Sequence, residues 1–253
     1  MPISDLSPGM KNVRPLAVSE MAAPALSIII PVLDEDSTIV QCLSALQPLR
    51  DGSSVEIVVA DGGSRDATPA LAAALADIVL ASPRGRGAQM NHGAASAHGD
   101  ILLFLHADTR LPDDVIARIN EAIRHGAVWG RFDVHIEGRI HGLRLVAAMM
   151  NLRSRLTGIA TGDQAIFVTR KAFDQVGGFP DMPLMEDIAF STQMRQRGRP
   201  ACLRQKVCTA GRRWEKHGLL RTILLMWQLR LRYFLGADPK QLARDYGYAP
   251  RES

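Results

Sequence analysis

The sequence lacks the features of disulfide-rich, zinc-binding and membrane-spanning proteins. Its 253 residues include only three cysteines, Cys42, Cys202 and Cys208. An odd number without C-x-x-C spacing argues against a disulfide framework and a zinc knuckle. The chain has no run of about 20 uncharged apolar residues, and residues 1–24 lack the continuous apolar segment of a signal peptide. We therefore expect a cytoplasmic protein that begins with a flexible tail over residues 1–24.

An excess of one charge is also largely absent. The formal net charge is only +4, and hydrophobic residues make up 47% of the sequence. A small, arginine-rich excess suits a phosphorylated partner, and a solvated basic surface is an equally good interpretation. Because the apolar content is enough for a sizeable core, we expect a globular protein, and we expect no nucleic-acid partner.

Strand-like and helix-like segments alternate through the first half of the chain. Short apolar runs at 26–30, 55–60 and 76–83 and the segment GDILLFLHAD are typical of buried strands, and a helical pattern follows each one. Pro31 cannot donate to a sheet ladder, so we expect the first strand to end there. Four such repeats predict an α/β fold with a mainly parallel sheet flanked by helices. Residues 25–214 would form this domain, with a helical extension over 215–253.

Polar residues follow each predicted strand, at the edge where open α/β sheets bind ligands. They are Asp34 and Glu35 after the first strand, Asp61 after the second, Arg84 and Arg86 after the third, and His106 and Asp108 after the fourth. Loop residues are polar in most proteins, but these carboxylates come directly after their strands. The pattern therefore predicts a ligand site at this edge.

The glycine-rich segment RGRGAQMNHG, 84–93, is a candidate phosphate-binding loop. A dinucleotide-binding G-x-G-x-x-G would need glycine at position 90, where the sequence has Met90, and the segment follows the third strand instead of the first. The segment therefore argues against a Rossmann dehydrogenase. Arg84 and Arg86 suit phosphate binding, and ordinary surface arginines are the alternative interpretation.

Acidic residues at two further places suit metal or acid–base chemistry. Asp108 is a candidate ligand for a divalent cation beside a diphosphate, with His106 either a second ligand or a hydrogen-bonded neighbour. Glu186 and Asp187 begin a predicted helix, where adjacent side chains point in different directions. One carboxylate would face the site while the other caps the helix, and two capping acids are the alternative.

Five segments, in order, resemble glycosyltransferase family 2, whose members use nucleotide sugars and have the GT-A fold. They are SIIIPVLDE, VVADGGSRDAT, FLHADT, TGDQAIFVTR and MEDIAF, and the resemblance extends from residue 26 to residue 214. More narrowly, the chain is similar to a bacterial branch named "transferase 2, rSAM/selenodomain-associated", in which HAD replaces the commoner D-x-D. The resemblance implies a Rossmann-like GT-A domain.

The resemblance also implies roles for individual residues. Asp108 matches the last acid of D-x-D and would hold Mg²⁺ or Mn²⁺, while His106 stands in place of the first acid. Asp187 matches the general base of inverting members. The nucleotide would contact Pro31, Val32, Leu33, Glu35, Asp61, Arg86, Gln89 and Arg213, with Asp61 on the base. The donor sugar or the acceptor would border Asp163, Gln164, Glu186 and Trp214.

These observations predict a metal-dependent inverting glycosyltransferase. It would move a sugar from a nucleoside diphosphate sugar, UDP above all, to the hydroxyl of a small-molecule or lipid acceptor. Ala210 stands where processive members have the glutamine of Q-x-x-R-W, which argues against polymer synthesis. Two alternatives stay open. One is a sugar nucleotidyltransferase, although PVLDE replaces its glycine-rich loop, and the other is a catalytically inactive nucleotide-sugar-binding protein.

The segment 217–239 predicts a long apolar helix that carries Arg221, Arg230 and Arg232. Our first expectation is that it packs on the catalytic domain or on a second subunit of a homodimer. The alternative is peripheral contact with the inner membrane face, with the arginines on anionic headgroups and Trp227 and Phe234 in the interface.

Overall fold

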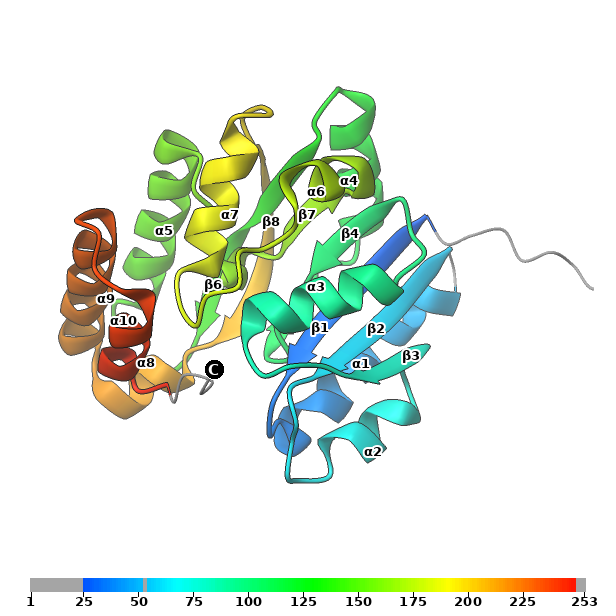
Figure 1. The fold of residues 1–253 in the computed structure, drawn as a ribbon, viewed down its shortest axis with the longest axis horizontal. Coiled ribbons are helices and arrows are strands. Elements are labelled where there is room, and N and C mark those ends of the chain that lie inside the picture. The colour runs from blue at the N-terminus through cyan, green and yellow to red at the C-terminus, as the bar shows by residue number, and fades with distance from the viewer. Residues whose placement is uncertain (1–24, 52–53, 249–253) are drawn as a thin grey trace, which may run out of the picture.

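A computed structural model describes residues 25–51 and 54–248, so the predicted tail over 1–24 lies outside the described residues. The first half alternates strands and helices as the sequence predicts (Figure 1). It contains β1 (Leu26–Val32), α1 (Asp36–Asp51), β2 (Val55–Asp61), α2 (Thr68–Ala73), β3 (Ile78–Ala81), α3 (Arg86–Ser96), β4 (Ile101–Phe104) and α4 (Val115–Arg124). β1 pairs in parallel with β2 and β4, and β2 pairs in parallel with β3. Their carboxyl ends therefore share one edge of the sheet.

The second half extends the same sheet in mixed directions. It contains β5 (Thr109–Arg110), β6 (Trp129–Glu137), α5 (Leu143–Thr157), the 3₁₀ turn η1 (Gly162–Gln164), β7 (Ile166–Thr169), α6 (Arg170–Val176), α7 (Glu186–Arg195) and β8 (Ala201–Ala210). The order across the sheet is β3-β2-β1-β4-β7-β6-β8-β5. β7 runs antiparallel to β4 and β6, whereas β8 runs parallel to β6. β8 had no counterpart among the predicted strands.

The predicted long helix over 217–239 forms only over 219–234, and it is the middle one of three helices. They are α8 (Arg212–His217), α9 (Leu219–Phe234) and α10 (Pro239–Tyr246). Gly218 and Gly236 separate them with φ values of 81° and 87°, a backbone region that glycine adopts without steric cost. The predicted boundary between 214 and 215 falls inside α8. Leu229 of α9 and Leu242 of α10 are buried with Met185 and Ile188 of the catalytic domain, so the extension packs on that domain.

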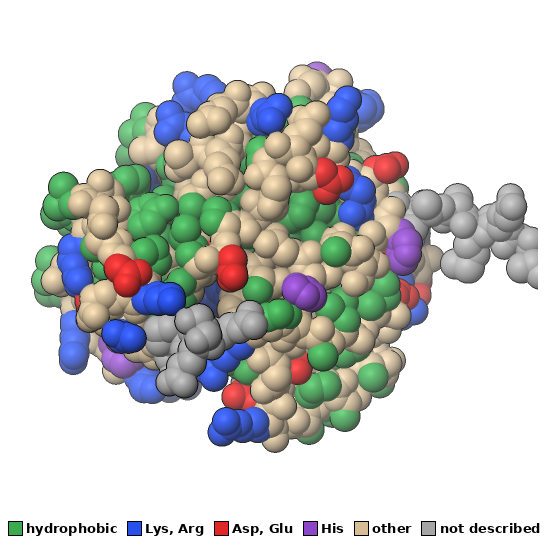
Figure 2. Space-filling model, in the orientation of Figure 1, with side chains coloured by type: hydrophobic (Ala, Val, Ile, Leu, Met, Phe, Trp, Pro, Cys, Tyr) green, Lys and Arg blue, Asp and Glu red, His purple; other side chains and the backbone are tan. Residues whose placement is uncertain are grey.

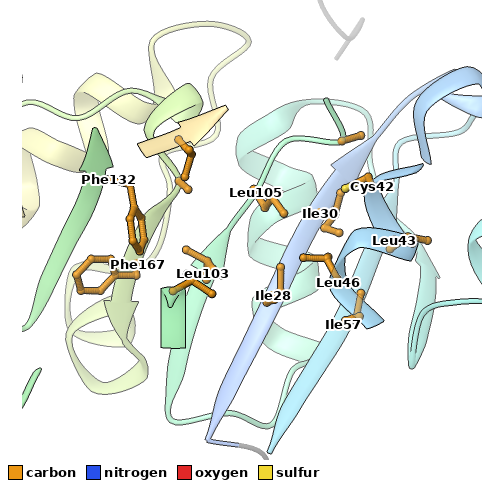
Figure 3. Close-up of a cluster of buried hydrophobic side chains, with 14 of the residues drawn as sticks. Ile28, Ile30, Cys42, Leu43, Leu46, Ile57, Leu103, Leu105, Phe132 and Phe167 are labelled. Atoms are coloured by element: carbon orange, nitrogen blue, oxygen red, sulfur yellow. The ribbon is translucent and has the colours of Figure 1, made fainter. Parts of the chain in front are cut away.

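Two layers of helices cover the sheet and enclose its apolar side chains. Buried residues of α1, α4 and α5 pack on one face, and those of α3, α6 and α7 pack on the other. Figure 3 shows Ile28 and Ile30 of β1 beside Cys42 of α1, with Leu103 of the neighbouring strand β4 in the same cluster. Full burial of each large aliphatic side chain contributes about 1.5–3 kcal/mol. This packing fixes the strand ends that carry the polar residues.

The prediction that β1 ends at Pro31 is wrong. β1 continues to Val32, and Pro31 pairs in register with Ala60 of β2. Alternate residues of a strand point their backbone groups to opposite neighbours. Ile29 accepts a hydrogen bond from Leu105 on the β4 side, so Pro31 also faces that side. β4 has already ended at Phe104, and the missing N–H of Pro31 therefore costs the ladder no hydrogen bond.

Candidate active site

A cleft of about 880 Å³ lies at the carboxyl ends of β1 and β4. One wall, which we call the strand-end wall, comes from the tips of these strands and from the start of α3. It comprises Pro31, Val32, Leu33, Glu35, Arg84, Gly85, Arg86, Gln89, His106, Ala107 and Asp108. The opposite wall, which we call the helical wall, comes from the C-terminal extension. It comprises Arg212, Arg213, Trp214, Thr222, Met226, Lys240, Tyr246 and Tyr248.

Asp108 and Glu35 both contact the guanidinium of Arg212 at one corner of the cleft. Arg212 donates from Nη2 to Asp108 Oδ2 at 3.2 Å, and the same nitrogen lies 3.5 Å from Glu35 Oε2. Burial opposes the charge of Arg212, but the two carboxylates outweigh it and raise the pKa of the guanidinium. This corner of the cleft therefore favours positive charge.

The same two carboxylates suit a modest metal site. In residues 25–51 and 54–248 no cluster of three or more His, Cys, Asp or Glu side chains is arranged to hold an ion by itself. Mg²⁺ and Mn²⁺ sites beside phosphates need only one or two carboxylates, because phosphate oxygens and water complete the shell. Asp108 and Glu35 meet that smaller requirement.

His106 is turned toward Asp163 of η1, which also lines the cleft. Its Nδ1 lies 3.4 Å from Asp163 Oδ1, and its other ring nitrogen packs so closely on Gly162 that a Cβ there would lie 2.5 Å away. Desolvation in the cleft works against ionisation of Asp163, yet the hydrogen bond and charge of His106 keep its pKa below the ordinary value. His106 is thus held against η1 by the contact of Nδ1 with Asp163 and by close packing on Gly162.

The paired acids at the start of α7, Glu186 and Asp187, lie next to η1 and have different environments. Asp187 accepts from the backbone N–H of Ile188 at 2.7 Å through Oδ1 and from that of Gly162 at 3.0 Å through Oδ2. Glu186 is buried and lines a void of about 10 Å³ shared with Arg86 and Asp187. Burial, followed by the charge of Asp187, raises the pKa of Glu186 to about 7. Asp187 therefore connects the first turn of α7 to η1, whereas Glu186 has a pKa raised toward neutral pH.

Two arginines meet tyrosines of the extension at the cleft. The guanidinium of Arg213 lies 3.5 Å from the centre of the Tyr246 ring, and it donates from Nη2 to the Tyr246 carbonyl at 2.8 Å. Arg86 lies 5.3 Å from the centre of the Tyr248 ring. The cation–π contact of Arg213 lies within the helical wall, and that of Arg86 connects the strand-end wall to the C-terminal segment.

Three predicted site residues are engaged in structural hydrogen bonds. Asp61 accepts from the backbone of Gly63 and Ser64, and from the Ser64 hydroxyl at 2.5 Å. Gln89 donates to the carbonyls at the ends of β1 and β2. Gln164 is fully buried, and its side chain accepts from the Thr161 N–H. Their contacts with a ligand stay predictions. Gln89 does line the cleft, as do Pro31, Val32, Leu33, Glu35, Arg86, His106, Asp108, Asp163, Arg213 and Trp214.

Two arginines, Arg153 on α5 and Arg230 on α9, lie within electrostatic reach of Asp187 and Asp163. Burial and the charge of Arg230 lower the pKa of Arg153 to about 10, and burial also lowers the pKa of Arg230. The two acids oppose these shifts without cancelling them. Nε and Nη2 of Arg153 are buried without a hydrogen-bond partner. Positive charge and unused donors thus lie beside the paired acids.

The sequence interpretation missed Arg212, Arg153, Tyr246 and Tyr248 as residues of the site. Arg212 precedes the predicted Arg213, so its place in the RRW segment was an available signal. The other three lie on α5, on α10 or just after α10, in segments whose positions depend on packing, and their spacing contains no such signal.

Comparison with known proteins agrees with this geometry. The model of the family "Glycosyl transferase family 2" matches residues 27–179. The chain belongs to this family. The predicted enzyme class, a glycosyltransferase, is thereby confirmed.

Curated relatives of this glycosyltransferase match only parts of the chain. Glucosyl-3-phosphoglycerate synthase of Mycolicibacterium paratuberculosis is 31% identical over 34% of this chain and 29% of its own length. Undecaprenyl-phosphate 4-deoxy-4-formamido-L-arabinose transferase of Pseudomonas aeruginosa is 30% identical over 53% of this chain and 41% of its own. The chain thus spans less than half the length of these relatives.

Solved structures confirm the predicted GT-A type of α/β fold. Glucosyl-3-phosphoglycerate synthase of Mycobacterium tuberculosis, in complex with Mn²⁺ and UDP, superposes with a TM-score of 0.59 at 19% identity, covering 90% of this chain and 82% of that chain. The mannosyltransferase PcManGT of Pyrobaculum calidifontis, in complex with GDP-Man and Mn²⁺, gives 0.58 at 21% identity, covering 90% and 70%.

Proposed function

We propose that this family 2 enzyme is a metal-dependent inverting transferase that moves a sugar from a nucleoside diphosphate sugar, UDP-linked above all, to an acceptor hydroxyl. The supporting observation is the shared location of unlike charges. Asp108 and Glu35 favour a cation, and Arg84 and Arg86 line the same wall of the cleft. The similar structures that contain UDP or GDP-Man with Mn²⁺ support the same donor class.

The strand-end wall would hold the donor. The pocket from Pro31 to Glu35 would take the base and ribose, and Asp108 would hold Mg²⁺ or Mn²⁺ against the diphosphate, with His106 keeping Asp163 in position. The cation would supply charge stabilisation for the departing diphosphate. Arg86, directed into the cleft, adds a fixed positive charge for the same purpose.

Asp187 would act as the general base. Its two hydrogen bonds to backbone N–H groups hold the carboxylate next to η1, in the small void that it shares with Arg86 and His106 of the cleft wall. Removal of the proton from an acceptor hydroxyl by a positioned carboxylate contributes about 10²–10⁴-fold to the rate. Glu186 lies beside it with a pKa raised to about 7, and we assign it to the border of the acceptor.

The acceptor would carry an anionic group. Arg153 and Arg230 present positive charge beside Asp187, and Arg153 has unused donors. Guanidinium groups recognise phosphate and carboxylate oxygens through parallel hydrogen bonds. The names of two similar proteins specify a phosphoglycerate and an undecaprenyl phosphate, which supports a phosphorylated acceptor here.

The test is a thermal-shift screen of UDP-, GDP- and dTDP-sugars with and without Mn²⁺, followed by transfer assays on Asp187→Asn. A ligand that binds only the folded state raises its stability. We expect a UDP-sugar to give the largest shift, and we expect Asp187→Asn to keep that shift while losing transfer. Loss of UDP binding in folded Asp187→Asn protein would contradict the base assignment. Tight binding without turnover in the unmodified protein would favour the inactive binding protein instead.

Release of pyrophosphate from UTP and a sugar phosphate would identify the nucleotidyltransferase alternative. The narrower assignments, to the rSAM-associated branch and to the cytoplasm, stay predictions.

A further inference from the structure

The exposed large hydrophobic side chains of the described residues are concentrated on two neighbouring helices. All but Val40 lie on α5, on α9 or at the residue after α9. Trp227 is 58% exposed and Leu235 is 77% exposed. We call this set the α5–α9 surface. It consists of Leu145, Met149, Leu152, Leu156, Leu220, Leu224, Trp227, Leu231, Phe234 and Leu235.

The spacing within each helix gathers its exposed hydrophobic residues into a stripe along one face. Positions 145, 149, 152 and 156 on α5, and positions 220, 224, 227 and 231 on α9, recur every three or four residues, so each set occupies one helix face. Leu143 of α5 and Leu219 of α9 belong to the same hydrophobic cluster at the base of the two helices. Figure 1 places α5 and α9 side by side at the left edge, where Figure 2 shows hydrophobic side chains at the surface.

The charges around this stripe indicate which kind of partner would cover it, a second copy of the chain or an anionic lipid surface. α5 and α9 contain no aspartate or glutamate. Of their arginines, Arg153 and Arg230 lie near the acids of the cleft, and Arg155 and Arg232 pair with Asp133 and Asp245. Arg144 and Arg221 are exposed, each directly beside a residue of the stripe. A second copy of the chain would bring arginine-rich helices together without a compensating acid on either helix. An anionic lipid surface provides both an apolar layer and negative charge.

The dimensions of α9 agree with a position in the plane of such a surface. Among the described residues, no helix has the length and apolar character needed to cross a membrane. The 16 residues of α9 would extend about 24 Å at 1.5 Å per residue. A helix with one apolar face and basic neighbours lies at the headgroup boundary, where tryptophan is also favoured.

We propose that the α5–α9 surface docks the enzyme on an anionic membrane. α9 would then have two working faces, because Thr222 and Met226 on its opposite side line the cleft. Docking places the helical wall next to the lipid headgroups, within reach of an acceptor that remains in the membrane. The inference depends on the exposed surface alone and does not require the proposed donor.

The test is flotation of the full chain with vesicles of phosphatidylcholine alone and with phosphatidylglycerol in equal parts, at low and high salt. We expect binding to the anionic vesicles that weakens with salt. Trp227→Asp and the pair Leu152→Asp, Leu156→Asp should each lower partitioning by about tenfold or more, because a charge replaces buried apolar surface. Val40→Asp is the matched control, since it changes an exposed hydrophobic residue of α1 and should bind as the unmodified chain does.

Two further measurements separate docking from unfolding and from self-association. Thermal denaturation should give similar midpoints for all variants, because the substituted side chains are exposed. Lipids brominated in the acyl chain should quench the fluorescence of the unmodified protein, and Trp227→Phe should lose most of that quenching while it still floats. Absence of flotation, equal flotation on neutral vesicles, or a dimer that Trp227→Asp dissociates without any vesicle binding would overturn the proposal.

Discussion

The strand-end wall and the helical wall face each other across one cleft but differ in construction. The strand-end wall consists of residues at and after the ends of β1 and β4 and at the start of α3, and ladder hydrogen bonds hold these strands to their neighbours. The helical wall consists of side chains from α8, α9 and α10, held by packing and by contacts such as Arg213 on Tyr246. Charged groups with fixed positions thus face a surface that depends on tertiary contacts.

This difference in construction fits two different functions for the walls. Electrostatic stabilisation of a departing diphosphate needs groups that do not reorganise during the reaction, and strand ends supply them. Acceptors differ among family members, as the names of the similar proteins indicate, and a wall of separately packed helices can vary without disturbing the sheet. We therefore expect changes to the strand-end wall to abolish chemistry, and changes near the helical wall to alter acceptor binding or stability.

The largest effect should come from Asp108→Asn. The variant loses the negative charge that faces Arg212 and would hold the cation, so we expect transfer to fall by about 10²-fold or more, the equivalent of several kcal/mol of charge stabilisation. Titration of Mn²⁺ in the transfer assay measures the change. Asp113→Asn, at an exposed position before α4, is the control. A variant of Asp108 with unaltered metal dependence would remove Asp108 from the site.

A smaller effect is expected for Arg153→Met, which should increase stability, whereas most substitutions decrease it. Because the substitution removes a charge with buried, unpaired Nε and Nη2 atoms, it should raise the free energy of unfolding by about 1–3 kcal/mol, as urea denaturation would measure. With UDP and Mn²⁺ already bound, binding of inorganic phosphate should weaken. Arg155→Met is the matched control on the same helix. Arg155 donates to Asp133 and to the Cys202 carbonyl, so its loss should lower stability. Equal destabilisation by both variants would contradict the acceptor role of Arg153.

The smallest effect should be a pH dependence at Glu186. Because its pKa is raised from 4.5 to about 7 in the folded protein, the folded state binds more protons than the unfolded state between these values. Stability from this group is present below the unfolded pKa and is lost as pH rises through the folded pKa. Glu186→Gln should remove this loss, so its melting temperature relative to the unmodified protein should increase from pH 4.5 to 7. A constant difference across that range would show that Glu186 does not titrate there.

The two walls were also unequally predictable from sequence. β1 to β4 are short, mostly apolar segments followed by turn residues, and these local patterns placed Glu35 and Asp108 at one edge. The same local argument failed at Pro31, because whether its missing donor costs a hydrogen bond depends on where β4 ends. Tyr246 and Tyr248 reach the cleft only because α10 folds back onto Met185 and Ile188. No pattern within residues 239–248 encodes that contact.

Pro31 also lies where the sheet opens between β1 and β4. A β ladder continues as long as each flank offers both a donor and an acceptor, and on the β4 side Pro31 offers only a carbonyl. After Leu105 donates to Ile29, the chain toward Asp108 finds no N–H on β1 to accept from, and it is free to diverge. The wedge between the two diverging backbones begins at this residue. The missing N–H of Pro31 thus lies at the boundary between the hydrogen-bonded sheet and a space that a ligand can enter.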